Sequence, residues 1–266
     1  MKYAFSTLGC PRWSWDDVFT TAKDLGLDGV EIRGLGDEIY APAIEAFQPE
    51  HIEKTKKELA RLGLAIPILT SGAILAEAEK AQQSFVEACA YVNLASSLGV
   101  RHVRVMGTGE PWATGGDFAL GARLFGHLCS YAAEWGVVPL IETNGALASS
   151  DEMLKFLEKA GSENCGVLWD VHHTVRFGKE SPAETVKKLG GYIRHVHVKD
   201  SEVDASGNIQ YRMMGHGDLP LKEAVDSLKG IGFEGFVSLE WVKRWQADLQ
   251  EPGIVFAQYA SFVKEL

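Results

Sequence analysis

Short apolar runs alternate with amphipathic stretches eight times along the chain, and this repetition constrains the fold more than any other feature of the sequence. Between the runs, apolar residues recur at helical spacing. Dividing 266 residues among eight units gives about 33 residues each, the size of a strand followed by a helix. The runs are KYAFS at 2–6, DGVEIR at 28–33, LAIPILT at 64–70, RHVRVM at 101–106, VVPLIE at 137–142, CGVLWD at 165–170, IRHVHVK at 193–199 and GFVSLE at 235–240.

Several amphipathic stretches end on a glycine just before the next run. Glycine readily takes the left-handed conformation that closes a helix and leads the chain into a strand. An open doubly wound sheet would show the same alternation, but no GxGxxG motif follows the first run, and eight regular units favour closure. We therefore predict one α/β domain over residues 1–266, a (β/α)8 TIM barrel with its active site at the C-terminal mouth. The closing glycines are Gly26, Gly63, Gly99, Gly136 and Gly232, and the clearest helical spacing lies in 48–63, 81–99, 116–136 and 219–232.

The overall composition limits the classes of partner. The net charge is -10, so no general surplus of Lys and Arg is available to bind nucleic acid. No apolar run approaches the roughly 20 residues that span a bilayer. The opening MKYAFSTLGCPRW reads as a strand entering a loop rather than as a signal peptide, and the four cysteines form no CxxC pair. We expect a cytoplasmic protein that acts on a small molecule, with no nucleic acid or membrane as partner, and the sequence allows a homo-oligomer.

The seventh run, IRHVHVK, alternates polar and apolar residues strictly. Side chains of a strand point to opposite faces in turn, so His195, His197 and Lys199 share one face while Val196 and Val198 share the other. In a closed barrel the face toward the helices is apolar. The two histidines and the lysine are therefore expected to point into the barrel, with Lys199 nearest the C-terminal mouth.

Three other runs end in an acid with the same inward parity: Glu142, Asp170 and Glu240. Together with His197, these acids come from four consecutive strands. Three carboxylates in a low-dielectric barrel are costly unless protonation or a cation relieves them. Three oxygen ligands and one imidazole suit Mn²⁺, with Mg²⁺, Co²⁺ and Zn²⁺ as alternatives. We predict one divalent metal ion, held by Glu142, Asp170, His197 and Glu240.

Other inward residues have two interpretations each. Lys199 either polarises a substrate oxygen or holds an anionic group, or else it forms a salt bridge to Glu142 or Glu240. Glu31, Arg33 and Arg104 also point inward by alternation. They form either a structural ion pair or a clamp on the substrate, and for Arg33 we favour substrate binding. Tryptophans that follow strand ends could stack on sugar rings or pack in the core: Trp13, Trp15, Trp112, Trp241 and Trp245.

The series IETN, WDVHH, HVHVKDS and SLEW resembles the xylose isomerase-like TIM barrels, a family of sugar phosphate isomerases and epimerases. The resemblance covers nearly the entire chain. It implies the same four metal ligands: Glu142, Asp170, His197 and Glu240. It also implies that His173, in a D-x-x-H pattern that begins at Asp170, contacts the substrate or a further metal.

The chain departs from two branches of that family. The apurinic-site endonucleases carry an Asp-x-His pair where this chain has Ile209 and Tyr211, and a histidine on strand four where it has Met106. A nuclease would therefore lack most of its metals. The ketohexose epimerases place a substrate-binding arginine where this chain has Val203. A ketohexose substrate is not favoured.

These observations predict a metal-dependent isomerase or epimerase of a keto-sugar or polyol. The metal would polarise the carbonyl, and Glu142 and Glu240 would move a proton on the adjacent carbon through an enediolate. A dehydratase or lyase of the inosose dehydratase or keto-glycoside type is the first alternative. An apurinic-site endonuclease and a barrel that binds without catalysis rank lower.

Overall fold

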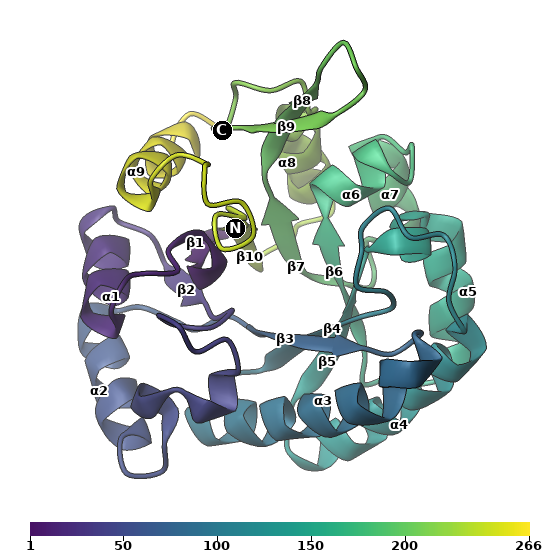
Figure 1. Ribbon diagram of the computed structural model, residues 1–266, viewed down its shortest axis with the longest axis horizontal. Helices are drawn as coiled ribbons and strands as arrows, with labels where there is room; N and C mark the ends of the chain where they lie inside the picture. Colours follow the sequence, from purple (N-terminus) through teal and green to yellow (C-terminus); the bar gives the residue numbers. More distant parts are fainter.

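Eight parallel strands form a curled sheet in the order β2-β1-β10-β7-β6-β5-β4-β3 in the computed structural model, which describes all 266 residues. Helices surround this sheet on the outside (Figure 1). The prediction of a (β/α)8 barrel is confirmed. The strands are β1 (Lys2–Ser6), β2 (Gly29–Glu31), β3 (Leu69–Ile74), β4 (His102–Met106), β5 (Val138–Glu142), β6 (Gly166–Asp170), β7 (Ile193–Val198) and β10 (Phe236–Leu239).

The barrel closes between β2 and the segment that leads into β3. Isolated parallel bridges join Gly29 to Ala65 and Ile32 to Leu69. The Val30 amide donates to the Ala65 carbonyl at 2.9 Å, and a Cβ at Gly29 would lie 2.5 Å from the same oxygen. Only glycine permits this close approach of two backbones.

The helices follow the strands in the expected order. Of the closing glycines, Gly63 and Gly99 cap α2 and α3 with φ of 69° and 74°, the left-handed geometry that the sequence predicts. The helices are α1 (Trp15–Asp24), α2 (Ile52–Leu62), α3 (Ala78–Leu98), α4 (Phe118–Glu134), α5 (Ser150–Ala160), α6 (Val171–Arg176), α7 (Pro182–Leu189), α8 (Leu221–Gly230) and α9 (Pro252–Phe262). Single 3₁₀ turns lie at Thr7–Gly9, Ala41–Ala43, Glu45–Phe47 and Gly145–Ala148. None of the helices combines the length and apolar character needed to span a bilayer.

Two details differ from the expected pattern. The third strand lies at Leu69–Ile74 rather than at 64–70. The predicted segment is joined to β2 only by isolated bridges at Ala65 and Leu69, and Pro67 between them has no N–H to donate. In addition, β8 (Asp200–Val203) and β9 (Ile209–Arg212) form an antiparallel hairpin at the mouth that was not predicted.

The core has two layers, one on each side of the strands. The large outer layer lies between strands and helices and includes Trp169, Val196 and Val198. A small inner layer fills the barrel with Ile68, Leu140 and Leu168. This division agrees with the alternation in the sequence, and it leaves the inward polar residues above the inner layer, toward the C-terminal mouth.

Candidate metal centre at the carboxyl ends of the strands

The four predicted metal ligands lie together in the barrel. Glu142 and Asp170 end β5 and β6, His197 is in β7, and Glu240 directly follows β10. One ligand atom from each lies within 4.8 Å of the others, and all four residues are buried. Such a buried cluster could hold a metal ion, because a cation would neutralise carboxylates that are removed from water.

The Nδ1 atom of His197 points at the three carboxylates. It lies 3.4 Å from Glu240 Oε1, 3.8 Å from Glu142 Oε1 and 3.9 Å from Asp170 Oδ2. These distances are too long for good hydrogen bonds, and the nitrogen is buried without a partner. A divalent cation would accept the lone pair of this nitrogen and one oxygen from each acid, so the donor set fits the predicted metal.

Glu31 holds the other side of the same imidazole. Its Oε2 lies 2.9 Å from Nε2 of His197 and 2.9 Å from Nε2 of His195. A carboxylate of low pKa only accepts, so both imidazoles donate from Nε2, and Nδ1 of His197 is the nitrogen turned toward the three acids. Burial alone would raise the pKa of Glu31, but the charges and hydrogen bonds of His197 and His195 outweigh it and hold that pKa well below 4.5.

Two buried cations flank the cluster. Lys199 Nζ donates to Glu240 Oε2 at 2.6 Å and also binds Asp170. The sequence suggested a salt bridge from Lys199 to Glu142 or Glu240, and the one to Glu240 is present. Glu142 pairs instead with Arg104, whose Nε lies 3.3 Å from Glu142 Oε2. Burial opposes the charge on Glu142, but Arg104 and then His197 outweigh it and lower the pKa of Glu142 to about 2.

His173 reaches the same cavity from the first turn of α6. The Asp170 carboxylate caps that helix by accepting from the His173 amide at 3.0 Å, which explains the spacing of the two residues. His173 Nδ1 lies 3.1 Å from the Thr143 carbonyl, which can only accept. The ring therefore carries its proton on Nδ1 and presents Nε2 as a hydrogen-bond acceptor. Burial lowers the pKa of His173, which favours this neutral form.

A cavity of about 460 Å³ opens above the cluster. Arg33, the third predicted substrate contact, lines it together with Lys199 and His173. The tryptophans divide between the two expected roles. Trp112 and Trp245 line the cavity and are 65% and 59% exposed, whereas Trp241 is buried in the core.

Two further residues line this cavity that the sequence did not identify as site residues. Asn144 directs its amide nitrogen to the Thr108 carbonyl at 2.7 Å and leaves its buried Oδ1 without a partner. Its position two residues after Glu142, at a strand end, is the signal that could have found it. Tyr211 enters the cavity from β9 and stacks on His172, with ring centroids 5.5 Å apart. Finding Tyr211 required the unpredicted hairpin.

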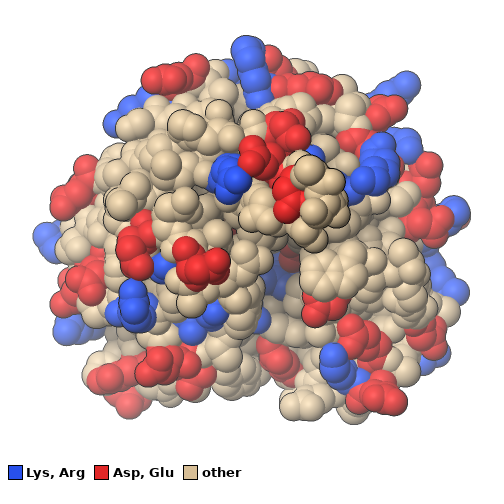
Figure 2. All heavy atoms as spheres, turned by 45° about the horizontal axis from the view of Figure 1, so that its top comes forward, with Lys and Arg blue, Asp and Glu red and all other residues tan.

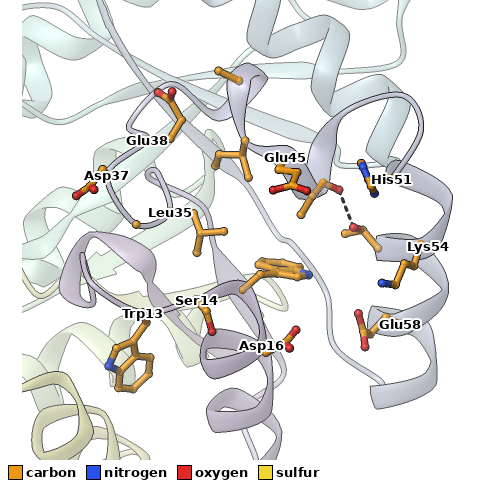
Figure 3. A pocket seen from close by; sticks show the side chains of 16 residues that line it. Trp13, Ser14, Asp16, Leu35, Asp37, Glu38, Glu45, His51, Lys54 and Glu58 are labelled. Atoms are coloured by element: carbon orange, nitrogen blue, oxygen red, sulfur yellow. Dashed lines mark hydrogen bonds between the residues drawn. The ribbon is translucent and has the colours of Figure 1, made fainter.

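A larger cavity, of about 640 Å³, lies outside the barrel (Figure 3). Four of the five acids that line it are exposed and Glu58 is half-buried, and no buried cluster of ligating groups faces it; the exposed acids are Asp16, Asp37, Glu38 and Glu45. Figure 3 shows Trp13, Ser14 and Asp16 at the start of α1 on one side, and His51, Lys54 and Glu58 at α2 on the other. The smaller cavity is therefore the candidate active site, because the buried charged groups converge there.

The face of the molecule drawn in Figure 2 mixes charges of both signs. Over the face drawn in Figure 2, acidic and basic side chains are interspersed, and a hollow opens near the centre. That face carries no broad basic area of the kind that would follow a nucleic-acid backbone.

Comparison with known proteins gives matches that cover most of the chain. A family model described as "Xylose isomerase-like TIM barrel" matches residues 19–260. A fructoselysine 3-epimerase from Shigella flexneri is 22% identical over 270 residues, covering 97% of this chain and 95% of that protein. Among solved structures, the probable 3-DHS dehydratase AsbF from Bacillus anthracis has a TM-score of 0.81 at 18% identity, covering 99% of both chains. The IOLI protein, solved with a bound zinc atom, has a TM-score of 0.78 at 18% identity, covering 98% of this chain and 96% of that one.

Proposed function

The chain belongs to the xylose isomerase-like TIM barrel family, and from this membership and the geometry of its cavity we propose that it is a divalent-metal-dependent isomerase or epimerase of a keto-sugar or polyol. The observation that carries the proposal is the unpartnered Nδ1 of His197, buried and faced by three carboxylates. The similarity to a fructoselysine 3-epimerase over 97% of the chain supports the same class of reaction.

We propose that Glu142, Asp170, His197 and Glu240 hold the metal, which is Mn²⁺ or a related divalent ion. When bound, the ion would polarise the substrate carbonyl and stabilise the negative charge that develops on its oxygen. The three carboxylates favour this role over acidifying water, because their charge already offsets much of the charge of the cation. Glu31 orients the imidazole of His197 so that Nδ1 faces the metal position, and it accepts a hydrogen bond from the proton that remains on Nε2 when Nδ1 binds the metal.

Glu142 and Glu240 would transfer the proton at the carbon next to the carbonyl. In each of them Oε1 faces Nδ1 of His197, while Oε2 faces a buried cation, Arg104 for Glu142 and Lys199 for Glu240. Their strands, β5 and β10, are separated in the sheet by β6 and β7. The two carboxylates can therefore approach a planar enediolate from different sides, as exchange of a proton between its faces requires.

The rest of the cavity suits a carbohydrate. Trp112 and Trp245 offer exposed aromatic faces for C–H surfaces of a sugar. The buried Oδ1 of Asn144 and Nε2 of His173 are acceptors that hydroxyl groups would satisfy. The substrate is accordingly a polyhydroxylated small molecule.

A dehydratase or lyase is the second candidate, favoured by one contact. Lys199 Nζ lies 2.6 Å from Glu240 Oε2, so an ammonium donor stands beside the proposed base. After a proton is removed from the carbon next to the carbonyl, that pair could protonate a hydroxyl that leaves from the following carbon. The same enediolate would then lose water instead of being reprotonated. The fold similarity to a probable 3-DHS dehydratase is compatible with this alternative.

The experiment is to incubate the Mn²⁺-loaded protein with a panel of keto-sugars, keto-glycosides and inososes and to follow each reaction by NMR. An isomer or epimer of unchanged composition supports the proposed function, whereas a product that has lost water or an aglycone supports the second candidate. Turnover should stop when EDTA removes the metal and return when Mn²⁺ is restored. Undiminished turnover in EDTA would contradict both.

A further inference from the structure

Arg104 is a buried cation whose hydrogen-bonding capacity is unused. The residue is 3% exposed, and no side-chain hydrogen bond is formed by its guanidinium group. Its Nε and Nη1 are buried without partners, and its ion pair with Glu142, at 3.3 Å, does not have hydrogen-bond geometry. A guanidinium has five N–H donors, and leaving them unmet in a buried site is costly. Because Arg104 lines the 460 Å³ cavity, a bound molecule could supply the missing acceptors.

Arg33 brings a second guanidinium to the same cavity. It donates from Nη1 to the Ile39 carbonyl at 3.4 Å, and its guanidinium lies over the ring of Trp245, 5.8 Å from the centroid. Gly72 leaves room for it, since a Cβ there would lie 3.3 Å from Arg33 Nη2. Burial, and then repulsion by Arg104, lower the pKa of Arg33 to about 10. Glu87 and Glu240 offset part of the charge of Arg33, and Glu142 offsets part of that of Arg104. Two guanidinium groups still line one space, where an anion would be attracted to both.

We infer that Arg104 and Arg33 together bind a carboxylate of the substrate, which is therefore a polyhydroxy acid rather than a neutral sugar. This inference rests on the proposed function and names the substrate class of the same site. Glu142 lies between the positions of the two ends of the bound substrate, because its Oε1 faces His197 while its Oε2 faces Arg104. The carbonyl and hydroxyl oxygens would lie on the His197 side, and the carboxylate would lie on the Arg104 side.

A carboxylate fits this position better than a phosphate. The planar guanidinium pairs in parallel with two oxygens of either group, so the charges around the cavity decide between them. Glu110 also lines the cavity, and its negative charge disfavours a doubly charged group. The glycine loop after β9, where barrels often bind phosphate, is already engaged: the amides of Gly215 and Gly217 both donate to Asp200 at 2.9 Å.

The experiment measures binding of three probes that have the same six-carbon polyol chain and no ketone or aldehyde. D-gluconate carries a carboxylate, D-glucitol carries none, and D-glucitol 6-phosphate carries a phosphate. Isothermal titration calorimetry with the Mn²⁺-loaded full chain gives the dissociation constants. We expect gluconate to bind about 10- to 100-fold more tightly than glucitol, as expected for hydrogen bonds to a charged group.

Three variants locate the carboxylate. Arg33→Met and Arg104→Met should each reduce the preference for gluconate over glucitol to less than about threefold. Arg33 forms no ion pair with a proposed ligand, so its variant gives the result even if Arg104→Met disturbs Glu142 or fails to fold. Arg101→Met, which removes an exposed arginine just before β4, is the matched control and should keep the full preference. If the arginines had a purely structural role, their loss would weaken the binding of gluconate and glucitol equally and leave the ratio of the two dissociation constants unchanged.

The inference is overturned if gluconate binds no more tightly than glucitol, including the case in which neither binds. It is also overturned if the preference survives in both cavity variants, or if glucitol 6-phosphate is preferred to gluconate. Repeating the titration on wild-type protein stripped with EDTA separates the arginines from the metal. The preference should persist there, and its loss would assign the carboxylate to the metal. Because no probe turns over, a lack of isomerase activity would not affect the result.

Discussion

Glu31 Oε2 lies 2.9 Å from Nε2 of His197 and thereby sets which nitrogen of that imidazole faces the three acids. The two residues are 166 positions apart in sequence and meet only because the barrel closes. His197 has one nitrogen bonded to a carboxylate and the other buried without a partner. This arrangement prepares a metal ligand before any metal arrives, because the orientation of the ring is already fixed with Nδ1 toward the three acids.

Replacing Glu31 by Gln should weaken metal binding. A neutral amide holds the imidazole less firmly and makes Nδ1 a poorer donor to the metal, so we expect Mn²⁺ affinity to fall about 10- to 100-fold. Competition with a fluorescent chelator measures the change, and circular dichroism checks that the variant is folded. Glu79→Gln, on the exposed face of α3, is the control and should bind like the wild type. An unchanged affinity in Glu31→Gln would show that this contact does not prepare the ligand.

Replacing Asp170 should remove the metal, and the choice of substitution matters. Asp170 is both a proposed ligand and the cap of α6, since its Oδ1 accepts from the His173 amide. Asp170→Ala loses both roles, and loss of the cap lowers the free energy of unfolding by about 1 kcal/mol. Asp170→Asn keeps the cap and loses only the anionic ligand. We expect both variants to lack stoichiometric metal in elemental analysis and only the alanine variant to lose the stability of the cap. Equal metal content in the wild type and Asp170→Asn would remove Asp170 from the ligand set.

Metal affinity should fall as pH falls. In the metal-free protein burial opposes the charged form of His197, but the charge of Glu31 and then that of Glu240 outweigh it, so the pKa of His197 is raised well above 6.5. Below that raised pKa the metal must displace a proton from His197. The metal affinity therefore rises with pH and levels off above the pKa, where the imidazole of the metal-free protein is already neutral. Titration calorimetry at neutral pH in buffers of different ionisation enthalpy should record proton release on binding Mn²⁺. Binding without proton release would contradict the assignment of His197 as a ligand.

The protein should not cleave abasic DNA. Ile209 and Tyr211 occupy positions where the endonuclease branch is expected to carry ligands, and the net charge of -10 disfavours binding to a duplex. Incubation of the Mn²⁺- or Zn²⁺-loaded protein with an abasic duplex at physiological salt should give no incision above background. Robust incision that His197→Ala abolishes would reverse the ranking of the two functions.

The fold was predictable because it depends on periodicities of the sequence that recur along the chain. Strand alternation gave the inward direction of Glu142, Asp170 and Glu240, since each ends an apolar run. The alternation was less useful for β3, which begins at Leu69, after Pro67, rather than at Leu64. It gave no sign of the β8–β9 hairpin, although the turn residues between Asp204 and Asn208 could have suggested one.

The contacts between site residues were harder to predict from the sequence than the directions in which their side chains point. Alternation predicted that Glu31 and Arg104 point inward, but not which residues they meet. Their partners depend on the height at which each side chain lies in the barrel, and hence on the stagger of strands distant in sequence. Glu31 meets the two histidines rather than an arginine, and Arg104 meets Glu142. The open acceptor of Asn144 likewise became visible only with its neighbours in place.

The exchange of solvent deuterium into a substrate tests the central claim, proton transfer by the two glutamates at a metal site, most directly. In D₂O, a substrate found in the panel should acquire deuterium at the carbon next to its carbonyl. Glu240→Gln keeps an oxygen ligand but removes the base, so exchange should slow about 10²- to 10⁴-fold while elemental analysis still finds the metal. Conversion that retains the original hydrogen at that carbon would point to a hydride shift and contradict the account.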